Sequence, residues 1–295
     1  MKNLRSLLFI PGDSQKKLAK ADMSGADALI LDLEDAVSPA NKPRARELVP
    51  AFLRARPRGG RHSQIWVRIN PLDTELALSD LTAVVAAEPD GFVLPKAKGP
   101  EDVLKLSYYL DALEAQCGLP QGSIKIIPLA TETPVAAFRL GDYATANLSR
   151  LVGITWGAED LATSIGASTN VDSSGQWTRT FHLVRSLTLL AARAAAVQPI
   201  DTLYVDFRDE AGLRASSRAS RAEGFTGRLA IHPAQITAIN ESYLPSAEEI
   251  EHAHKIVAAF AAAPGAGTVG MDGRMIDIPH LKQAQSVLAE VAARG

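Results

Sequence analysis

The sequence has little of several features that mark particular classes of protein. Cys117 is the only cysteine, which excludes an intramolecular disulfide and a zinc site built from several cysteines. The 31 basic and 33 acidic residues give a net charge of -2, so the basic surplus typical of nucleic-acid binding is missing. No apolar run approaches the ~18 residues of a membrane span. No Gly-x-Gly-x-x-Gly motif follows a candidate strand, which argues against a dinucleotide-binding fold.

Two further expectations concern the amino terminus and the lone cysteine. Residues 1–8 run directly into a strand-like segment without a cleavage-site pattern, so we expect a cytoplasmic protein. Cys117 lies four residues after Leu113 on an apolar helical stripe, which predicts a buried thiol. With 46% hydrophobic and 22% charged residues, the 295-residue composition is ordinary for a globular chain. One large domain with a small appendage is the simplest interpretation.

Short apolar runs alternate with segments of helical periodicity, which is typical of βαβ units around a parallel sheet. The clearest helix begins at Pro100, carries acidic residues in its first turn, and ends before Gly118. Eight strands with intervening helices in a chain of this length favour a (β/α)8 TIM barrel. The candidate strands are residues 4–11, 28–33, 65–70, 91–95, 124–130, 151–156, 202–205 and 229–232.

The chain continues beyond the eighth candidate strand as a C-terminal helical extension. Two helices are expected at residues 247–261 and 280–293, joined by a Gly-rich stretch at 264–273. We therefore predict a catalytic barrel domain over residues 1–245 and a helical arm over 246–295. A Gly-rich connection is flexible, so this arm is expected to act as a lid or to reach a neighbouring subunit.

Polar residues end most of the candidate strands. In a (β/α)8 barrel the active site lies at the carboxyl ends of the strands, so these side chains should meet at one mouth. Carboxylates gathered at the rim of an apolar core need a cation, and oxygen ligands without a Cys or His cluster favour Mg²⁺ or Mn²⁺ over zinc. Arg68 offers a planar fork suited to a carboxylate. The acidic candidates are Asp32, Glu34, Asp35, Glu132, Glu159 and Asp160.

Each candidate also has an ordinary structural interpretation. Asp13 and Asp35 are suited to capping helices. Lys96 could simply pair with a neighbouring carboxylate, and His232 before Pro233 could end a strand in an extended turn. Asp206 resembles the start of a turn that leads into the next helix. Their shared position at the same end of successive strands is what favours a functional site.

Eight longer segments, taken in order along nearly the whole chain, resemble one known family. They are Arg5-Ser-Leu-Leu-Phe-Ile-Pro-Gly-Asp, Leu31-Asp-Leu-Glu-Asp-Ala-Val-Ser-Pro, Trp66-Val-Arg-Ile-Asn, Thr131-Glu-Thr-Pro, Gly157-Ala-Glu-Asp-Leu, Tyr204-Val-Asp-Phe, Ile231-His-Pro-Ala-Gln and Gly273-Arg-Met-Ile-Asp-Ile-Pro-His. The family is the citrate lyase beta-subunit-like family, which includes malyl-CoA and citramalyl-CoA lyases. The resemblance implies a (β/α)8 barrel with a C-terminal extension that binds Mg²⁺ and makes or breaks the bond beta to a thioester carbonyl.

The resemblance also implies roles for individual residues. Glu132 and Asp160 correspond to the metal ligands, and Arg68 to the group that grips the substrate carboxylate. The acids of the Asp-Leu-Glu-Asp motif, Glu34 and Asp35, would support metal-bound waters.

One more role falls in the C-terminal arm. Asp277 corresponds to the acid/base residue, which an adjacent subunit contributes in several members. The resemblance further implies a homo-oligomer, with a trimer favoured.

The expected activity is that of a Mg²⁺-dependent carbon–carbon lyase. It would cleave or form 3-hydroxy-3-carboxyacyl-CoA thioesters such as malyl-, citramalyl- or citryl-CoA, with a 2-oxo acid and an acyl-CoA as the other partners. Lys96 and His232, at the rim, are expected to contact the substrate, while Asp277 protonates the enolate. Two alternatives stay open, a metal-dependent aldolase on free 2-keto-hydroxy acids and a citrate lyase beta-type subunit acting on a carrier-bound thioester.

Overall fold

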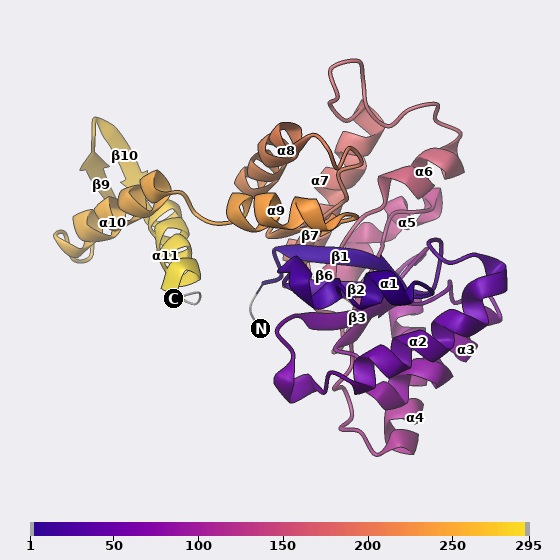
Figure 1. Cartoon of the computed structure of the whole chain (residues 1–295). Helices are drawn as coiled ribbons and strands as arrows, with labels where there is room; N and C mark the ends of the chain where they lie inside the picture. Colours follow the sequence, from indigo (N-terminus) through magenta and orange to yellow (C-terminus); the bar gives the residue numbers. More distant parts are fainter. Residues whose placement is uncertain (1–2, 293–295) are drawn as a thin grey trace. The chain divides into compact units, whose positions relative to one another are not determined.

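The computed structural model describes residues 3–292, and the chain divides into two compact units. The first runs from Asn3 to Asn240 and the second holds the chain from Glu241 onward. Figure 1 shows both units, with most of their helices and strands labelled. None of the helices in the described part of the chain is long and apolar enough to cross a bilayer.

The first unit is a barrel of eight parallel strands with helices on its outside, so the predicted fold class is confirmed. The strands run in the order β5-β4-β3-β2-β1-β8-β7-β6. Hydrogen bonds between β5 and the β6 segment close the barrel, with Ala130 N donating to Thr155 O at 2.9 Å and Val152 N to Ile126 O at 3.2 Å. The strands are β1 (Ser6–Pro11), β2 (Ala28–Asp32), β3 (Gln64–Arg68), β4 (Gly91–Leu94), β5 (Lys125–Pro128), β6 (Gly153–Ile154), β7 (Gln198–Asp201) and β8 (Gly227–Ala230).

Alternating strand residues fill the interior of the barrel with large apolar side chains. Ile30, Trp66 and Ile200 are fully buried there in one cluster. Gly91 makes room for the indole of Trp66, because a Cβ at this position would lie 2.2 Å from the Trp66 ring. Close packing of this kind holds the strand ends, and hence the loops that follow them, in fixed positions.

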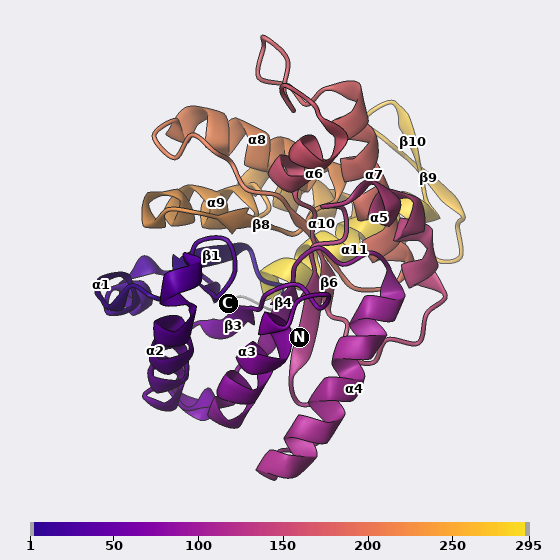
Figure 2. The same ribbon diagram turned by 90° about the vertical axis from the view of Figure 1, so that its right-hand side faces the viewer.

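Helices of the first unit cover the outside of the strands, and Figure 2 shows α2, α3 and α4 there in succession. The longer ones pack apolar faces inward, as amphipathic periodicity predicts. Their bounds are α1 (Gln15–Leu18), α2 (Lys42–Arg54), α3 (Leu76–Val84), α4 (Pro100–Cys117), α5 (Pro134–Arg139), α6 (Ala158–Ile165), α7 (Arg179–Ala194), α8 (Glu210–Glu223) and α9 (Ile236–Ser242), the last running into the second unit.

Helix α4 has the predicted bounds, and it buries the predicted face at Val103, Leu106 and Leu110 but not in its last turns. It ends at Gly118, whose φ of 68° is the left-handed conformation that glycine favours. Cys117 is exposed, so the expectation of a buried thiol is wrong. The inward stripe passes instead through Glu114, whose carboxylate accepts hydrogen bonds from Arg150 at 2.6 and 2.9 Å. A buried ion pair thus takes the place that apolar periodicity assigned to a hydrophobe.

The seventh strand lies earlier in the chain than predicted. It spans Gln198–Asp201, and the predicted stretch 202–205 is part of the loop that follows its carboxyl end. Because this strand contains Pro199 and Asp201, it does not stand out in the sequence as an apolar run. Asp201 is nevertheless fully buried, because arginines from α7 and β8 neutralise it.

The second unit contains two helices and a hairpin. Helix α10 (Ala247–Ala261) starts with a capping box in which Ser246 and Glu249 bind each other's backbone, and α11 spans Ile278–Ala292. Residue 293, the last of the predicted helix, lies outside the described residues. The Gly-rich connection is not featureless, since β9 (Thr268–Met271) and β10 (Arg274–Asp277) pair in an antiparallel hairpin. Asp272 and Gly273, with φ values of 51° and 73°, form its tight turn.

Candidate functional site

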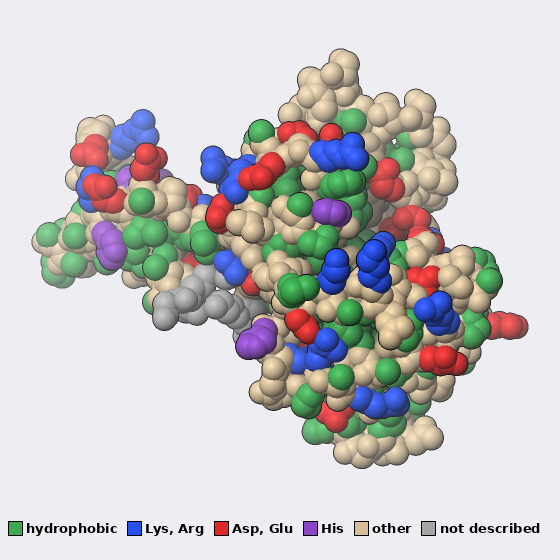
Figure 3. Space-filling view, in the orientation of Figure 1, with side chains coloured by type: hydrophobic (Ala, Val, Ile, Leu, Met, Phe, Trp, Pro, Cys, Tyr) green, Lys and Arg blue, Asp and Glu red, His purple; other side chains and the backbone are tan. Residues whose placement is uncertain are grey.

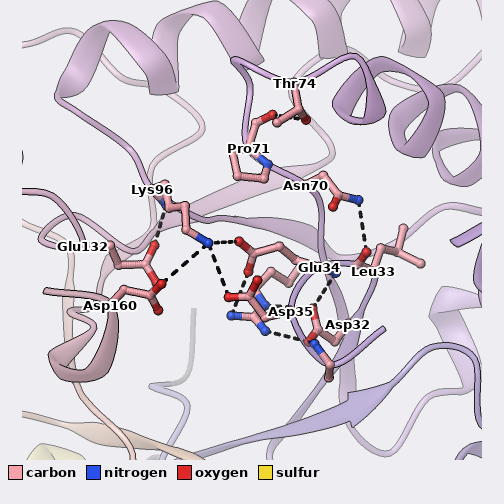
Figure 4. Close-up of polar contacts among 12 residues, drawn as sticks. Asp32, Leu33, Glu34, Asp35, Asn70, Pro71, Thr74, Lys96, Glu132 and Asp160 are labelled. Carbon is pink, nitrogen blue, oxygen red and sulfur yellow. Dashed lines mark hydrogen bonds and ion pairs between the residues drawn. The ribbon is translucent and has the colours of Figure 1, made fainter. Parts of the chain in front are cut away.

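Six of the predicted site residues lie together at the carboxyl ends of strands β2 to β6. Each stands at the end of its strand or in the loop or helix turn that follows it. Figure 4 shows the ammonium group of Lys96 between two pairs of carboxylates, those of Glu34 and Asp35 and those of Glu132 and Asp160. The six residues are Glu34, Asp35, Arg68, Lys96, Glu132 and Asp160.

Glu132 is a buried acid with little to balance its charge. Among the described residues its carboxylate accepts one hydrogen bond, from the backbone N–H of Lys96. Burial, together with the nearby carboxylate of Asp160, raises the pKa of Glu132 to about 8. Gly157 leaves the room that this side chain occupies, because a Cβ there would lie 2.8 Å from Glu132 Cγ. A cation at this carboxylate would remove the cost of burying its charge.

Asp160 lies in the first turn of α6, and about a third of its side chain is exposed. Its carboxylate lies 3.6 Å from Lys96 Nζ. The first turn of a helix favours an acid, since the free backbone N–H groups there carry partial positive charge. Asp160 therefore stays open to solvent beside the buried Glu132, as a group that could bind a metal together with it.

Lys96 adopts an unusual backbone conformation to make its contacts. Its φ of 52° is left-handed, which is uncommon for a residue other than glycine. The ammonium group pairs with Glu34, with Asp35 at 3.3 Å and with Asp160. Strained backbone of this kind concentrates at functional sites, where the surrounding structure maintains it. Lys96 also borders a small cavity of about 50 Å³, which Lys98 and Lys105 line as well.

The guanidinium group of Arg68 is held by the carboxylates of Asp32 and Glu34. Asp32 accepts from its Nε at 2.7 Å and from its Nη2 at 2.6 Å, and Nη1 lies 3.0 Å from the carboxylate of Glu34. The guanidinium carbon also lies 4.7 Å from the centre of the Phe9 ring. Asp32 therefore fixes the plane of the guanidinium at the end of β3, a role that strand-end reasoning did not assign to it.

The site as a whole carries more negative than positive groups. Within the described residues, the five carboxylates of Asp32, Glu34, Asp35, Glu132 and Asp160 outnumber the cations near them, which are Arg68, Lys96 and, beneath the Glu34 turn, Lys42. Within residues 3–292, no three His, Cys, Asp or Glu side chains converge as a metal site by themselves. A Mg²⁺ ion commonly takes one or two carboxylates and completes its shell with water and substrate oxygens. Glu132 and Asp160 fit that pattern, because one is buried with unbalanced charge and the other is open to solvent.

His232 belongs to a different part of the same barrel face. It follows β8, and its ring stacks on Phe207 with centroids 4.5 Å apart. Its Nδ1 accepts from Ala234 N at 3.2 Å, so the neutral ring presents Nε2 as a donor. The buried side chain of Gln235 ties this loop to Tyr204 O at 2.8 Å. The result is an exposed aromatic platform on ordered loops.

Asp277, the predicted acid/base residue, lies in the second unit. It ends strand β10, and its carboxylate pairs with the imidazole of His280. That contact holds the pKa of Asp277 below its usual range. Its catalytic role stays a prediction, as do the roles predicted for the barrel residues.

Strand-end reasoning missed Lys42, and it counted Asp32 among the acids of the mouth without its role of holding Arg68. Lys42 is buried, and its ammonium group is surrounded by carbonyl oxygens beneath the loop that carries Glu34. A signal was present, because Lys42 shares the inward face of α2 with Ala45, Val49 and Leu53. A lysine on the apolar stripe of a helix indicates a buried cation with specific partners.

Family models match this chain over most of its length. Residues 5–233 match the model described as HpcH/HpaI aldolase/citrate lyase. Residues 188–295 match a model for a C–C bond lyase of the TIM-barrel fold.

Curated relatives align with nearly the whole chain. The citrate lyase subunit beta of Haemophilus influenzae is 34% identical, with 98% of this chain and 97% of the relative covered. The (3S)-malyl-CoA thioesterase of Cereibacter sphaeroides is 36% identical, covering 98% and 95%. The mitochondrial citramalyl-CoA lyase of Rattus norvegicus is 34% identical, covering 96% and 85%.

A solved structure has the same architecture. The protein CitE from Mycobacterium tuberculosis, in complex with magnesium, acetoacetate and coenzyme A, superimposes with a TM-score of 0.81. The two chains are 30% identical, and the match covers 99% of this chain and 100% of that one.

Proposed function

This chain belongs to the HpcH/HpaI aldolase/citrate lyase family, and from that membership we propose that it is a Mg²⁺-dependent carbon–carbon lyase acting on 3-hydroxy-3-carboxyacyl-CoA thioesters. The observation that carries the proposal is the buried, unbalanced carboxylate of Glu132 beside Asp160. Relatives named for CoA esters favour this activity over an aldolase acting on free hydroxy acids.

Glu132 and Asp160 are the proposed metal ligands. They would hold a Mg²⁺ ion, and an ion there would supply the positive charge that lowers the pKa of the substrate hydroxyl. Glu34 and Asp35, which already bind the Lys96 ammonium, are suited to accept hydrogen bonds from water in the same site. Their exposure differs sharply, with the Glu34 side chain 3% and the Asp35 side chain 57% exposed.

Arg68 and Lys96 are the proposed contacts of the substrate acid. Asp32 holds the Arg68 guanidinium in one orientation, so little side-chain entropy is lost when a carboxylate binds it. The Lys96 ammonium is held by carboxylates, and a substrate carboxylate would compete with them for it.

Cleavage of the bond between C2 and C3 of the thioester releases a 2-oxo acid and leaves its electron pair on the thioester as an enolate. Protonation of that enolate carbon gives the acyl-CoA. Asp277 is the proposed acid/base residue: as a carboxylate of lowered pKa it would accept the proton of the 3-hydroxyl and return it to the enolate carbon, and in the condensing direction it would remove the alpha proton. We further propose that the arm, residues 246–295, closes over a barrel domain of residues 1–245, with Asp277 acting on its own or a neighbouring subunit's barrel.

The Phe207–His232 platform is the proposed contact for the CoA portion. A flat aromatic surface with a fixed Nε2 donor suits an adenine ring, and the neighbouring Arg208 guanidinium lies 5.6 Å from the Phe207 ring centre. This keeps His232 in the substrate-binding role that strand-end reasoning assigned to it.

A panel of malyl-CoA, citramalyl-CoA and citryl-CoA, each with Mg²⁺ and with EDTA, tests the activity. We expect one of them to yield a 2-oxo acid and acetyl-CoA in equal amounts, only with Mg²⁺, and without free thiol. Free thiol without a 2-oxo acid would mean thioester hydrolysis and would refute the lyase proposal. The same panel on an acyl carrier distinguishes a carrier-bound substrate.

Assembly and location are also proposals. We propose a homotrimer in the cytoplasm, and the mass of the native protein in solution together with cell fractionation would test both.

A further inference from the structure

Lys42 is a buried cation directly beneath the turn that carries Glu34. Its ammonium group donates to Leu33 O at 2.7 Å, to Glu34 O at 2.8 Å and to Asn70 Oδ1 at 2.8 Å. An ammonium group has three hydrogens, so these bonds use its full donor capacity. The two carbonyls belong to the residues that follow β2, where the chain leaves the barrel wall and enters the site.

Asn70 and Asp80 hold the ammonium group in place from the other side. Asn70 Nδ2 donates to Leu33 O at 3.0 Å, a contact drawn in Figure 4, and to Asp80 Oδ2 at 2.6 Å. Asp80 also accepts from Asn70 N at 2.8 Å and from Arg46 Nε at 2.7 Å. The network therefore joins α2, α3 and the end of β3 to one short turn.

The opposite side of the turn is held just as firmly. Asp32 accepts from Glu34 N at 2.9 Å and from Ala36 N at 3.0 Å. Lys42 thus fixes the carbonyls of the turn and Asp32 fixes its N–H groups. With both sets of backbone groups occupied, the backbone of Glu34 is held where its carboxylate lies between Arg68 and Lys96.

We propose that Lys42 is a positioning residue for the metal centre, one that acts through the backbone of Leu33 and Glu34 and touches no reacting atom. The inference rests on the proposed function, because it takes Glu34 to support water bound to Mg²⁺. An apolar residue would satisfy the packing of this helix face, where Ala45 and Val49 are its neighbours. Only a donor with several hydrogens can hold two adjacent carbonyls and an amide at once, which explains a lysine in this position.

Lys42→Met tests the proposal, with Arg46→Met as the matched control. Both remove a cation from the same network, but within residues 3–292 Arg46 donates only to Asp80 and to Leu76 O, and it makes no contact with the Glu34 turn. Mg²⁺ affinity is measured by calorimetry on the full chain without substrate, and kcat and KM are measured on the active thioester. We expect Lys42→Met to weaken Mg²⁺ binding about tenfold and to lower kcat about 10- to 100-fold, with KM for the thioester little changed.

Arg46→Met should lose stability while keeping wild-type Mg²⁺ affinity and kcat. Equal Mg²⁺ affinity and kcat in the two variants would overturn the positioning role. If Lys42→Met does not fold, Asn70→Ala replaces it, because that change leaves the ammonium in place but removes one of its acceptors. Asn70→Ala should lower both Mg²⁺ affinity and kcat, each by less than Lys42→Met does. Wild-type values of both quantities in Asn70→Ala would refute the proposal. A wild-type chain that binds Mg²⁺ but cleaves no thioester would refute the substrate alone, since the calorimetric comparison still decides the role of Lys42.

Discussion

Two buried acids of the same barrel, Asp201 and Glu132, have opposite electrostatic environments. Asp201 accepts from Trp156 Nε1 at 2.7 Å, from Thr202 N at 2.8 Å and from two arginines. Burial alone would raise its pKa, but Arg228 and Arg185 lower the pKa of Asp201 to about 2. Glu132 accepts from one backbone N–H and lies near a second acid, and its pKa is raised to about 8.

The difference separates a structural acid from a functional one. Asp201 has its partners within the chain, and its charge holds α7, β7 and β8 together. Glu132 is buried at similar cost without an equivalent partner, so its charge balance has to be completed by something the polypeptide does not supply. Burial therefore does not identify the site, whereas burial without compensation does.

Removing the charge of Asp201 should have the largest effect on stability. Asp201→Asn removes the buried anion that Arg185 and Arg228 share and leaves Arg185 only its partly exposed partner Glu223, which should lower the free energy of unfolding by about 3–5 kcal/mol. Urea unfolding of the metal-free protein measures it. Asp73→Asn is the matched control, because Asp73 pairs with Lys98 on the surface and should cost no more than about 1 kcal/mol. If Asp201→Asn and Asp73→Asn lose equal free energy of unfolding, Asp201 is not a structural acid in the sense proposed.

Replacing the Glu132 carboxylate by an amide should lower activity, whereas the corresponding change at Asp201 lowers stability. Glu132→Gln should reduce Mg²⁺-dependent turnover by more than about 100-fold, since even the partners of metal ligands are worth 10- to 100-fold. In EDTA the free energy of unfolding should not fall, because a neutral amide no longer carries the cost of a buried charge. Adding Mg²⁺ at 100 times its Kd should stabilise the wild type by about 2.7 kcal/mol and leave the variant unchanged. A stability loss like that of Asp201→Asn would assign Glu132 a structural role.

Acid should weaken the structural pair specifically. The folded-state pKa of Asp201, about 2, lies below the ordinary value of 3.8, so its contribution is complete above about pH 5 and is lost as pH falls toward 2. Over that range the contribution amounts to about 2 kcal/mol. The stability gap between wild type and Asp201→Asn should therefore narrow by about 1 kcal/mol between pH 5 and pH 3. A gap that stays constant, measured by urea unfolding at both values, would place the source of the pair's stability elsewhere.

The contrast between the two acids also explains what sequence reasoning could reach. Glu132 lies in the loop after β5 and Asp160 in the first turn of the helix after β6, and the barrel geometry brings such positions together, so the acidic cluster was predictable from local patterns. Asp201 was not, because its partners come from α7 and β8 and nothing near it in the chain indicates them. Its strand was placed four residues too late for the same reason.

The inward charges on helices follow the same logic. Glu114 and Lys42 both occupy apolar stripes, yet their partners, Arg150 and the Leu33 and Glu34 carbonyls, come from other elements. Periodicity fixes which face of a helix points inward, while only the tertiary structure shows what a charge on that face meets. Cys117 was wrongly expected to be buried because a search for apolar residues continues the stripe through Leu113, whereas the buried stripe continues through Glu114.

The smallest effect is expected at Lys96, where the backbone N–H binds Glu132 and the ammonium group binds the other carboxylates of the site. Lys96→Gly and Lys96→Ala both remove the cation from Glu34, Asp35 and Asp160, but only glycine adopts a φ of 52° without strain. The glycine variant should therefore be more stable than the alanine variant by about 1 kcal/mol, measured by urea unfolding. Both should show the same rise in KM for the thioester, since that effect belongs to the missing ammonium group. If KM instead followed stability, Lys96 would serve mainly to place its own N–H on Glu132, and the charge of the site would be left to the metal and Arg68.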